Sequence, residues 1–186
     1  MNDVVNIIEA LLFASPEPLT QKKVNIIFDV DPPHLEACIE TLSKKFESND
    51  HAISILHIAG GYQLRTKSEF DLHVRRLLNK TGQLDLSQAA LESLSIIAYK
   101  QPIIRADIEA IRGVDCAGVL KTLLKKSLIK IKGRDDGPGR PLLYNTTDAF
   151  LQYFGLSRLA DLPKLKEMSE LLDEQPALTD QIDAFK

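Results

Sequence analysis

The sequence has no tryptophan and only two cysteines, Cys38 and Cys116, among its 186 residues. Two cysteines far apart in the chain provide neither a metal-ligand pattern nor a disulfide framework. Such sparse cysteine is typical of a protein of the reducing cytosol. We therefore expect a cytoplasmic protein without disulfides.

Long hydrophobic runs are also absent from the sequence. No stretch approaches the roughly 20 apolar residues that span a bilayer. The apolar N-terminal segment lacks the basic leader of a signal peptide, and Asp3 and Glu9 flank or interrupt it. We expect this segment to be a helix of the fold, and we expect no membrane partner.

A converging set of catalytic groups is missing as well. The Gly137–Gly139 segment is glycine-rich, but Pro138 removes a backbone amide that a phosphate cradle needs. Asp135 and Asp136 fall in a predicted turn, where a solvated turn is favoured over an acid/base pair. No histidine has metal-ligand spacing to a cysteine or carboxylate; the four are His34, His51, His57 and His73. We expect no enzyme, no cofactor and no metal.

What the sequence does contain is an ordinary globular composition with unevenly distributed charge. Hydrophobic residues make up 44% and charged residues 26% of the chain, and the net charge is −3. Basic and acidic residues number 9 and 12 in residues 1–86, 10 and 6 in residues 87–147, and 4 and 8 in residues 148–186, so the net charges are −3, +4 and −4. The middle block alone could attract a polyanion, and a mildly basic surface without a ligand is the simpler alternative.

The chain also carries an internal repeat. Two segments align without a gap at an offset of 84 residues, because 102 − 18 = 84 brings Pro18 onto Pro102. Identical or conservative apolar pairs follow at that offset, including Ala14/Ala98, Ile27/Ile111, Val30/Val114, Leu35/Val119 and Ile39/Leu123. A shared apolar spacing over a whole three-helix pattern predicts two units of one fold.

The second copy of the repeat shows three predicted helices, over about 87–100, 105–111 and 115–126. Ser87 and Asp115 are the predicted N-caps, and Gly113 provides the turn between the second and third helices. The residues predicted to face inward or to anchor the turn are Leu91, Leu94, Ile97, Ala98, Ile104, Ile108, Ile111, Val114, Val119, Leu120, Leu123 and Leu124. Two helices joined by a short glycine-containing turn form a helix-turn-helix.

A β-hairpin is predicted after each helix-turn-helix. In the second copy an alternating strand over 128–133, a Gly/Pro-rich turn over 134–139 and a returning strand over 140–145 precede a short helix capped by Thr147 or Asp148. The first copy repeats this order, with helices over about 2–14, 20–28 and 33–47, a hairpin over 53–66 and a helix over 68–79. A helix-turn-helix followed by such a hairpin is a winged helix.

The predicted fold class is α+β, mostly helical, with two tandem winged-helix domains. The first domain is expected over 1–80, a polar linker over 81–86, the second domain over 87–163 and an acidic, flexible tail over 164–186. Within the tail Leu165, Met168, Leu171 and Leu172 have helical spacing, so a short amphipathic helix is an alternative there.

DNA recognition is the commonest use of a helix-turn-helix, and the third helix would supply the base-reading side chains. In the first unit its outward residues include Glu36 and Glu40, which repel phosphate. In the second unit they include Cys116, Ala117 and Gly118, and the helix has no Arg, Asn or Gln. Nonspecific contact with the DNA backbone remains open, as does a solvated basic face, through Lys121, Lys125, Lys126, Lys130, Lys132 and Arg134.

Protein binding is the remaining function class. The returning strand carries consecutive apolar residues, whereas a half-buried strand needs only every second residue to be apolar. One face of this strand is therefore predicted to bind a partner, although burial on both sides is the alternative. Arginine and tyrosine are enriched in interface hot spots, and the candidate partner-binding residues are Arg140, Leu142 and Tyr144.

Three long segments of the sequence resemble a known family. The segments Ile8–Leu19, Ser93–Val114 and Gly137–Leu156 are similar to signature stretches of the segregation and condensation protein B family, and the resemblance extends over about residues 7–163. Cys116 and Ala117 depart from this pattern, because polar or acidic residues are more usual there.

The resemblance implies a function that spacing alone does not give. Proteins of that family are non-catalytic, tandem winged-helix accessory subunits of the bacterial SMC–kleisin condensin complex. A homodimer that binds the kleisin, segregation and condensation protein A, is therefore expected, with the SMC ATPase reached through the kleisin and a nucleoid-associated location. A winged-helix DNA-binding transcriptional regulator is the alternative.

Overall fold

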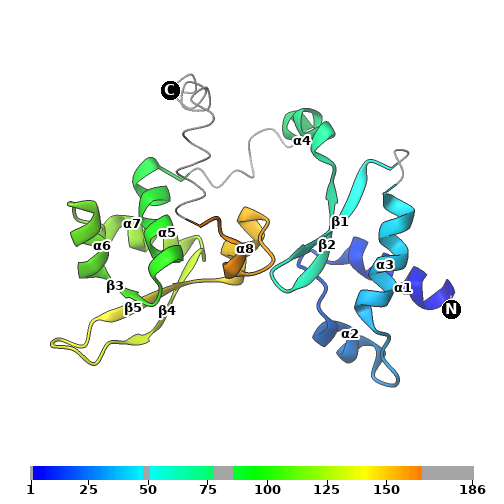
Figure 1. Cartoon of the computed structure of the whole chain (residues 1–186), viewed down its shortest axis with the longest axis horizontal. Helices are drawn as coiled ribbons and strands as arrows, with labels where there is room; N and C mark the ends of the chain where they lie inside the picture. The colour runs from blue at the N-terminus through cyan, green and yellow to red at the C-terminus, as the bar shows by residue number, and fades with distance from the viewer. Residues whose placement is uncertain (1, 48–50, 78–85, 165–186) are drawn as a thin grey trace.

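The computed structural model of the chain describes residues 2–47, 51–77 and 86–164, and it contains two winged-helix units, as predicted (Figure 1). The first unit comprises α1 (Asn2–Ala14), α2 (Gln21–Phe28), α3 (Leu35–Phe46), β1 (Ile53–Ile58), β2 (Gly61–Thr66), the 3₁₀ turn η1 (Ser68–Phe70) and α4 (Asp71–Leu77). The second comprises α5 (Gln88–Lys100), β3 (Ile103–Ile104), α6 (Arg105–Arg112), α7 (Ala117–Lys125), β4 (Ile129–Arg134), β5 (Leu142–Thr146), α8 (Asp148–Phe154) and η2 (Leu159–Asp161).

Hydroxyl side chains begin several of these helices. Thr20, Ser87 and Thr147 each accept a hydrogen bond from the backbone N–H three residues later, which satisfies one of the free donors of a helix start. The predicted caps Ser87 and Thr147 are thus confirmed. At the other end of α6, Gly113 has φ 74°, the left-handed conformation that glycine adopts without strain.

The start of α7 differs from the prediction by one residue. Asp115 is not the N-cap, because the helix begins at Ala117 after Cys116. The Asp115 carboxylate still accepts a hydrogen bond from the Ala117 N–H at 3.1 Å. The Cys116 N–H donates instead to Glu109 Oε1 of α6 at 3.0 Å, so a side chain of the preceding helix caps α7.

Each unit has its own hydrophobic core. In the first unit the buried apolar residues are Ile8, Leu12, Leu19, Val24, Leu35, Cys38, Ile39, Leu42 and Phe46. In the second they are Ala90, Leu94, Ile97, Ala98, Ile103, Ile108, Cys116, Leu120, Leu123, Leu128, Ile129, Tyr144 and Phe150. Ile111, predicted to face inward, is 50% exposed, and Val114, predicted to anchor the turn, is 54% exposed. Leu91, in the predicted apolar stripe, is 38% exposed, whereas Cys116, predicted to face outward, is fully buried.

The sheets of the two units have related topologies. In the first, β1 and β2 form an antiparallel hairpin, and Leu19 adds an isolated bridge to Tyr62. In the second, the strand order is β3-β5-β4, with antiparallel pairs and a bulge between Ile131 and Gly133. The sequence interpretation missed β3, because two residues directly after a proline give no alternating pattern.

The gapless repeat at offset 84 holds only for part of each unit. It pairs α2 with α6, which begin 84 residues apart. The helices before them, α1 and α5, both have 13 residues but end at Ala14 and Lys100, so they correspond at an offset of 86. The buried residues Leu35, Ile39 and Leu42 of α3 match Cys116, Leu120 and Leu123 at an offset of 81. Insertions in the loops account for these shifts.

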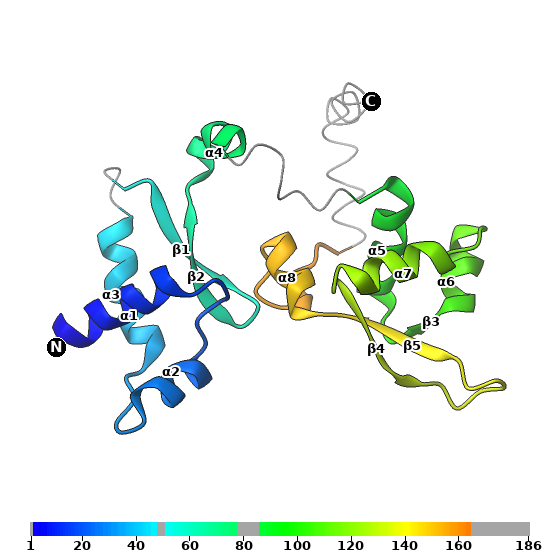
Figure 2. The ribbon, with the colours of Figure 1, turned by 180° about the vertical axis from the view of Figure 1, so that it is seen from behind.

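A small contact joins the two units (Figure 2). The turn between β1 and β2 reaches the segment after α8, where the Ala59 N–H donates to the Leu156 carbonyl at 2.9 Å and the Gly60 N–H donates to the Ser157 carbonyl at 3.0 Å. The Ser157 hydroxyl also lies 2.7 Å from His57 Nδ1. The two core clusters share no residue, and Ile58, which is 1% exposed beside this turn, belongs to neither of them.

The predicted linker over 81–86 lies outside the described residues except for Leu86, which packs against the second core. The predicted tail and its amphipathic spacing also lie outside them, apart from Lys164.

Candidate interaction surfaces

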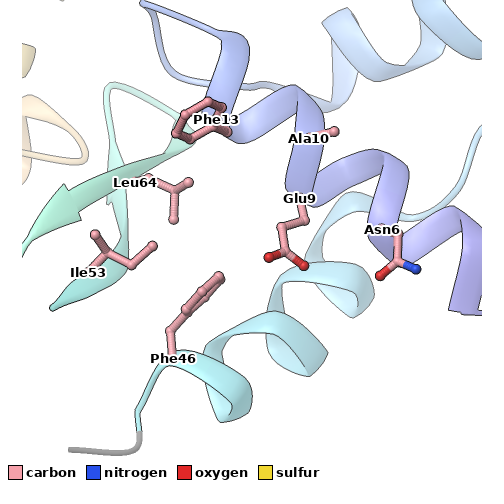
Figure 3. Close-up of a pocket in the computed structure, with 7 residues that line it drawn as sticks. All are labelled: Asn6, Glu9, Ala10, Phe13, Phe46, Ile53 and Leu64. Atoms are coloured by element: carbon pink, nitrogen blue, oxygen red, sulfur yellow. The ribbon is translucent and has the colours of Figure 1, made fainter. Parts of the chain in front are cut away.

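An apolar pocket lies between α1 and the hairpin of the first unit (Figure 3). It has a volume of about 400 Å³ and is lined by Asn6, Glu9, Ala10, Phe13, Phe46, Ile53 and Leu64. Ile53, Leu64 and Phe46 form its base from the two strands and the end of α3. Glu9, at its rim, is held by Lys45 of α3 through contacts of 2.8 and 2.9 Å.

Phe13 is the most unusual residue of this pocket, because 83% of its surface is exposed to solvent. A phenylalanine that contributes so little to its own core points to an interaction with something outside the unit. The sequence interpretation did not single out this site. The sequence of α1 nevertheless indicates it. This helix carries only two charged residues and is apolar nearly all round, a pattern typical of a helix covered on both sides.

The predicted partner-binding strand is β5, and its residues face different surroundings. Tyr144 is only 7% exposed and belongs to the second core, where it pairs with Ile103 across the sheet. Leu142 packs against the same core. Arg140 is exposed at the hairpin end, and its carbonyl accepts a hydrogen bond from Arg134 Nη1 at 3.0 Å. The ring of Tyr144 is therefore not an exposed anchor, and Arg140 is the accessible member of the three.

The predicted basic face lies on α7, the turn after it and β4. Lys121, Lys125, Lys130, Lys132 and Arg134 are exposed, and Lys126 is half-buried. None of these six cations takes part in an ion pair of the described chain. The equivalent outward face of α3 carries Glu36 and Glu40 together with the exposed Lys44, so it is mixed in charge where the face of α7 is basic.

A compact charged network holds the helix-turn-helix of the second unit. Arg105 pairs with both Glu109 and Asp115, and Glu109 also accepts the Cys116 N–H. That backbone donor and the Arg105 guanidinium hold the pKa of Glu109 below its ordinary value. Burial, reinforced by the Glu109 charge, raises the pKa of the Cys116 thiol, which makes it a core residue rather than a nucleophile.

Among the residues that the structure describes, no cluster of three or more His, Cys, Asp or Glu side chains could hold a metal ion. Within the same ranges, no helix has the length and apolarity needed to cross a bilayer. Asp135, at the predicted turn, accepts the Gly137 N–H at 2.7 Å, a local turn bond.

The chain is similar to proteins of one family along nearly its whole length. Residues 6–165 match the family model described as "Segregation and condensation complex subunit ScpB". Segregation and condensation protein B of Syntrophotalea carbinolica is 47% identical over 178 residues, which cover 96% of this chain and 90% of that protein.

Two solved structures are also similar. ScpB from Mycobacterium tuberculosis is 30% identical, with 83% of this chain and 96% of that chain covered and a TM-score of 0.39. A structure described as a dimer of the ScpB N-terminal domain complexed with ScpA peptide is 27% identical, with 40% and 86% covered and a TM-score of 0.36. Both scores are below 0.5, so neither defines how the units of this chain are arranged.

The family match extends from α1 to the end of the second unit, and it includes both winged helices described above. The identity to the relative is far above what a shared fold alone requires. The chain therefore belongs to the ScpB family of segregation and condensation complex subunits.

Proposed function

We propose that this chain is a non-catalytic accessory subunit of a bacterial SMC–kleisin condensin complex and that it binds the kleisin as a homodimer. Family membership over residues 6–165 is the observation that carries the proposal. The exposed apolar pocket of the first unit supports it, because such surfaces mark protein–protein contacts. The SMC ATPase is then reached through the kleisin, and the nucleoid location follows from the complex.

The alternative of a DNA-binding transcriptional regulator is not favoured. Base readout relies on Arg, Asn or Gln at the front of the third helix. The outward residues of α7 are instead Gly118, Lys121, Thr122 and Lys125, and α3 presents Glu36 and Glu40. Weak nonspecific contact between the six cations of the basic face and a phosphate backbone stays a separate prediction.

The experiment is light scattering coupled to size-exclusion chromatography, with the full chain alone and mixed with the middle region of the kleisin. We expect a dimer alone and a larger complex with the kleisin. A chain that ignores the kleisin would contradict the proposed function, whatever its own oligomeric state.

The affinity of the chain for duplex DNA, measured at two salt concentrations, distinguishes nonspecific backbone binding from a DNA-binding regulator. Backbone binding loses affinity steeply as salt rises. Lys121→Glu should weaken such binding equally for all sequences. Tight binding to one operator that is lost in Lys121→Glu would favour the regulator instead.

A further inference from the structure

The tip of the first hairpin carries a buried residue that neither core accounts for. Ile58 is the last residue of β1 and is 1% exposed, yet it belongs to neither core cluster. Residues of a strand alternate between its two faces, so Ile58 lies on the same face as Leu56 and opposite to Ile55, which packs against the first core. Leu56 is 45% exposed, so this face is open to solvent only two residues before it becomes buried.

The hairpin itself offers little that could cover Ile58. Its partner across the two strands is Gly61, which has no side chain. The two residues between them, Ala59 and Gly60, form the turn and have φ values of 49° and 71°, as in the type I′ turns of tight hairpins. Because the hairpin ends at this turn, we expect the cover to come from another segment of the chain.

The segment bonded to this turn belongs to the second unit. The Ala59 N–H donates to the Leu156 carbonyl at 2.9 Å. The Gly60 N–H donates to the Ser157 carbonyl at 3.0 Å. Figure 2 shows the tip of the hairpin next to α8, and Leu156 itself packs against the second core. Two backbone hydrogen bonds therefore connect the turn beside Ile58 to a segment that is anchored in the other unit.

A side-chain contact reinforces these backbone bonds. The Ser157 hydroxyl lies 2.7 Å from His57 Nδ1. The His57 ring lies against Tyr62, with the ring centroids 4.9 Å apart, and Tyr62 packs against the first core. A serine hydroxyl both donates and accepts hydrogen bonds, so this contact does not require one protonation state of the imidazole. The contact is thus anchored in the first core through Tyr62 and in the second through the neighbour of Ser157.

We propose that these groups form an intramolecular clasp, in which the β1–β2 turn holds residues 156–157 and Ile58 is buried between the two units. The clasp keeps both winged helices of one chain in a closed arrangement. Because it involves few residues, it is also releasable, and its opening exposes Ile58 beside Leu56 and frees the two N–H donors of the turn. The inference goes beyond the proposed function, since it concerns a single chain and does not require the kleisin.

Amide hydrogen exchange, measured by NMR on the full chain, tests the clasp. The hydrogen bonds of the Ala59 and Gly60 N–H groups go to the second unit. Both amides should therefore exchange at least about tenfold faster in Ile58→Asp, because a carboxylate in place of the buried side chain opens the clasp. The Tyr62 N–H donates to the Leu19 carbonyl within the first unit and should stay protected, as the internal reference.

Leu56→Asp is the matched control for this exchange measurement. It introduces the same charge on the same strand face, two residues from Ile58, at a position that is already exposed to solvent. The Ala59 and Gly60 amides should stay slow in this variant. Fast exchange of both turn amides in the parent chain would overturn the clasp. Equal exchange of both in the parent and in Ile58→Asp would overturn it as well.

Cross-linking tests the closed arrangement without relying on the folding of the charged variant. A chain that carries both His57→Cys and Ser157→Cys should be linked within itself by a short bismaleimide. The natural Cys38 and Cys116 are both buried. Leu72→Cys replaces His57→Cys in the control, because α4 follows the far end of β2, a strand of six residues and about 20 Å.

The result expected is a link in the first pair and none in the control. Absence of a link in the first pair, or a link that joins only two separate chains, would overturn the clasp. Binding of the kleisin is not measured in either experiment, so a chain that fails to bind it counts against the proposed function alone.

Discussion

At the residue scale, one side chain, Glu109, connects the two helices of the second helix-turn-helix. This carboxylate accepts the Cys116 N–H at the start of α7 and pairs with Arg105. The sequence predicted a cap at this helix but assigned it to Asp115. A side chain seven residues upstream can reach the Cys116 amide only because α6 and α7 cross at a short turn, which no local pattern encodes.

The lowered pKa of Glu109 has a consequence for stability at acid pH. A group whose folded pKa lies below its unfolded value, about 4.3, stabilises the fold above that value and loses this contribution as the pH falls through the folded pKa. The free energy of unfolding should therefore fall, partly through this group, as the pH drops below about 5.

Chemical denaturation at neutral and acid pH measures this effect. The fall should be smaller in Glu109→Gln, because glutamine does not titrate. Asp107→Asn makes the same charge change on α6 at an exposed position and should retain the fall. Equal falls in the parent and Glu109→Gln would contradict the assignment.

At the scale of secondary-structure elements, the role of a glycine depends on the backbone conformation at its position. Gly113 and Gly118 show the difference within one motif. Gly113 ends α6 with a positive φ, whereas Gly118 lies inside α7 with an exposed, open space beside its Cα. Glycine is required at the first position and merely tolerated at the second.

Alanine substitutions of these two glycines should therefore have opposite signs. Gly113→Ala should destabilise the fold by about 1–2 kcal/mol, the cost of a left-handed conformation for a residue with a Cβ. Gly118→Ala should stabilise it by up to about 1 kcal/mol, because alanine is the better helix former. Thermal and urea denaturation of both variants would check the signs. Destabilisation by Gly118→Ala would contradict the open space beside this residue.

The described residues form two core clusters, and the units meet through a few hydrogen bonds next to the buried Ile58. Leu42 and Leu123 occupy matching buried positions on α3 and α7, one in each core. Because the two core clusters share no residue, the destabilisation caused by a cavity in one unit should be confined to that unit.

Leu42→Ala and Leu123→Ala test this independence. Each should cost about 2–5 kcal/mol in its own unit. Hydrogen exchange should accelerate in residues 2–77 for Leu42→Ala and in residues 86–164 for Leu123→Ala. Acceleration across both ranges in either variant would show that the units unfold together.

The sequence by itself determined the two winged helices, their order and the family, because apolar spacing, caps and turn residues act locally and repeat. It also indicated the exposed cations of α7 and β4 and the exposed Glu36 and Glu40 of α3, since outward positions follow from the helical and strand periods. These features depend on residues close together in the chain.

The tertiary structure alone decided which apolar residues remain uncovered. Ile111 and Val114 share the apolar pattern of core residues yet are exposed, and Tyr144 was expected at a partner surface yet is buried. Phe13 and Tyr99 occupy equivalent helix positions, and they differ because the chain after one hairpin folds back while the chain after the other projects away. Burial depends on what distant segments cover, and a local pattern does not carry that information.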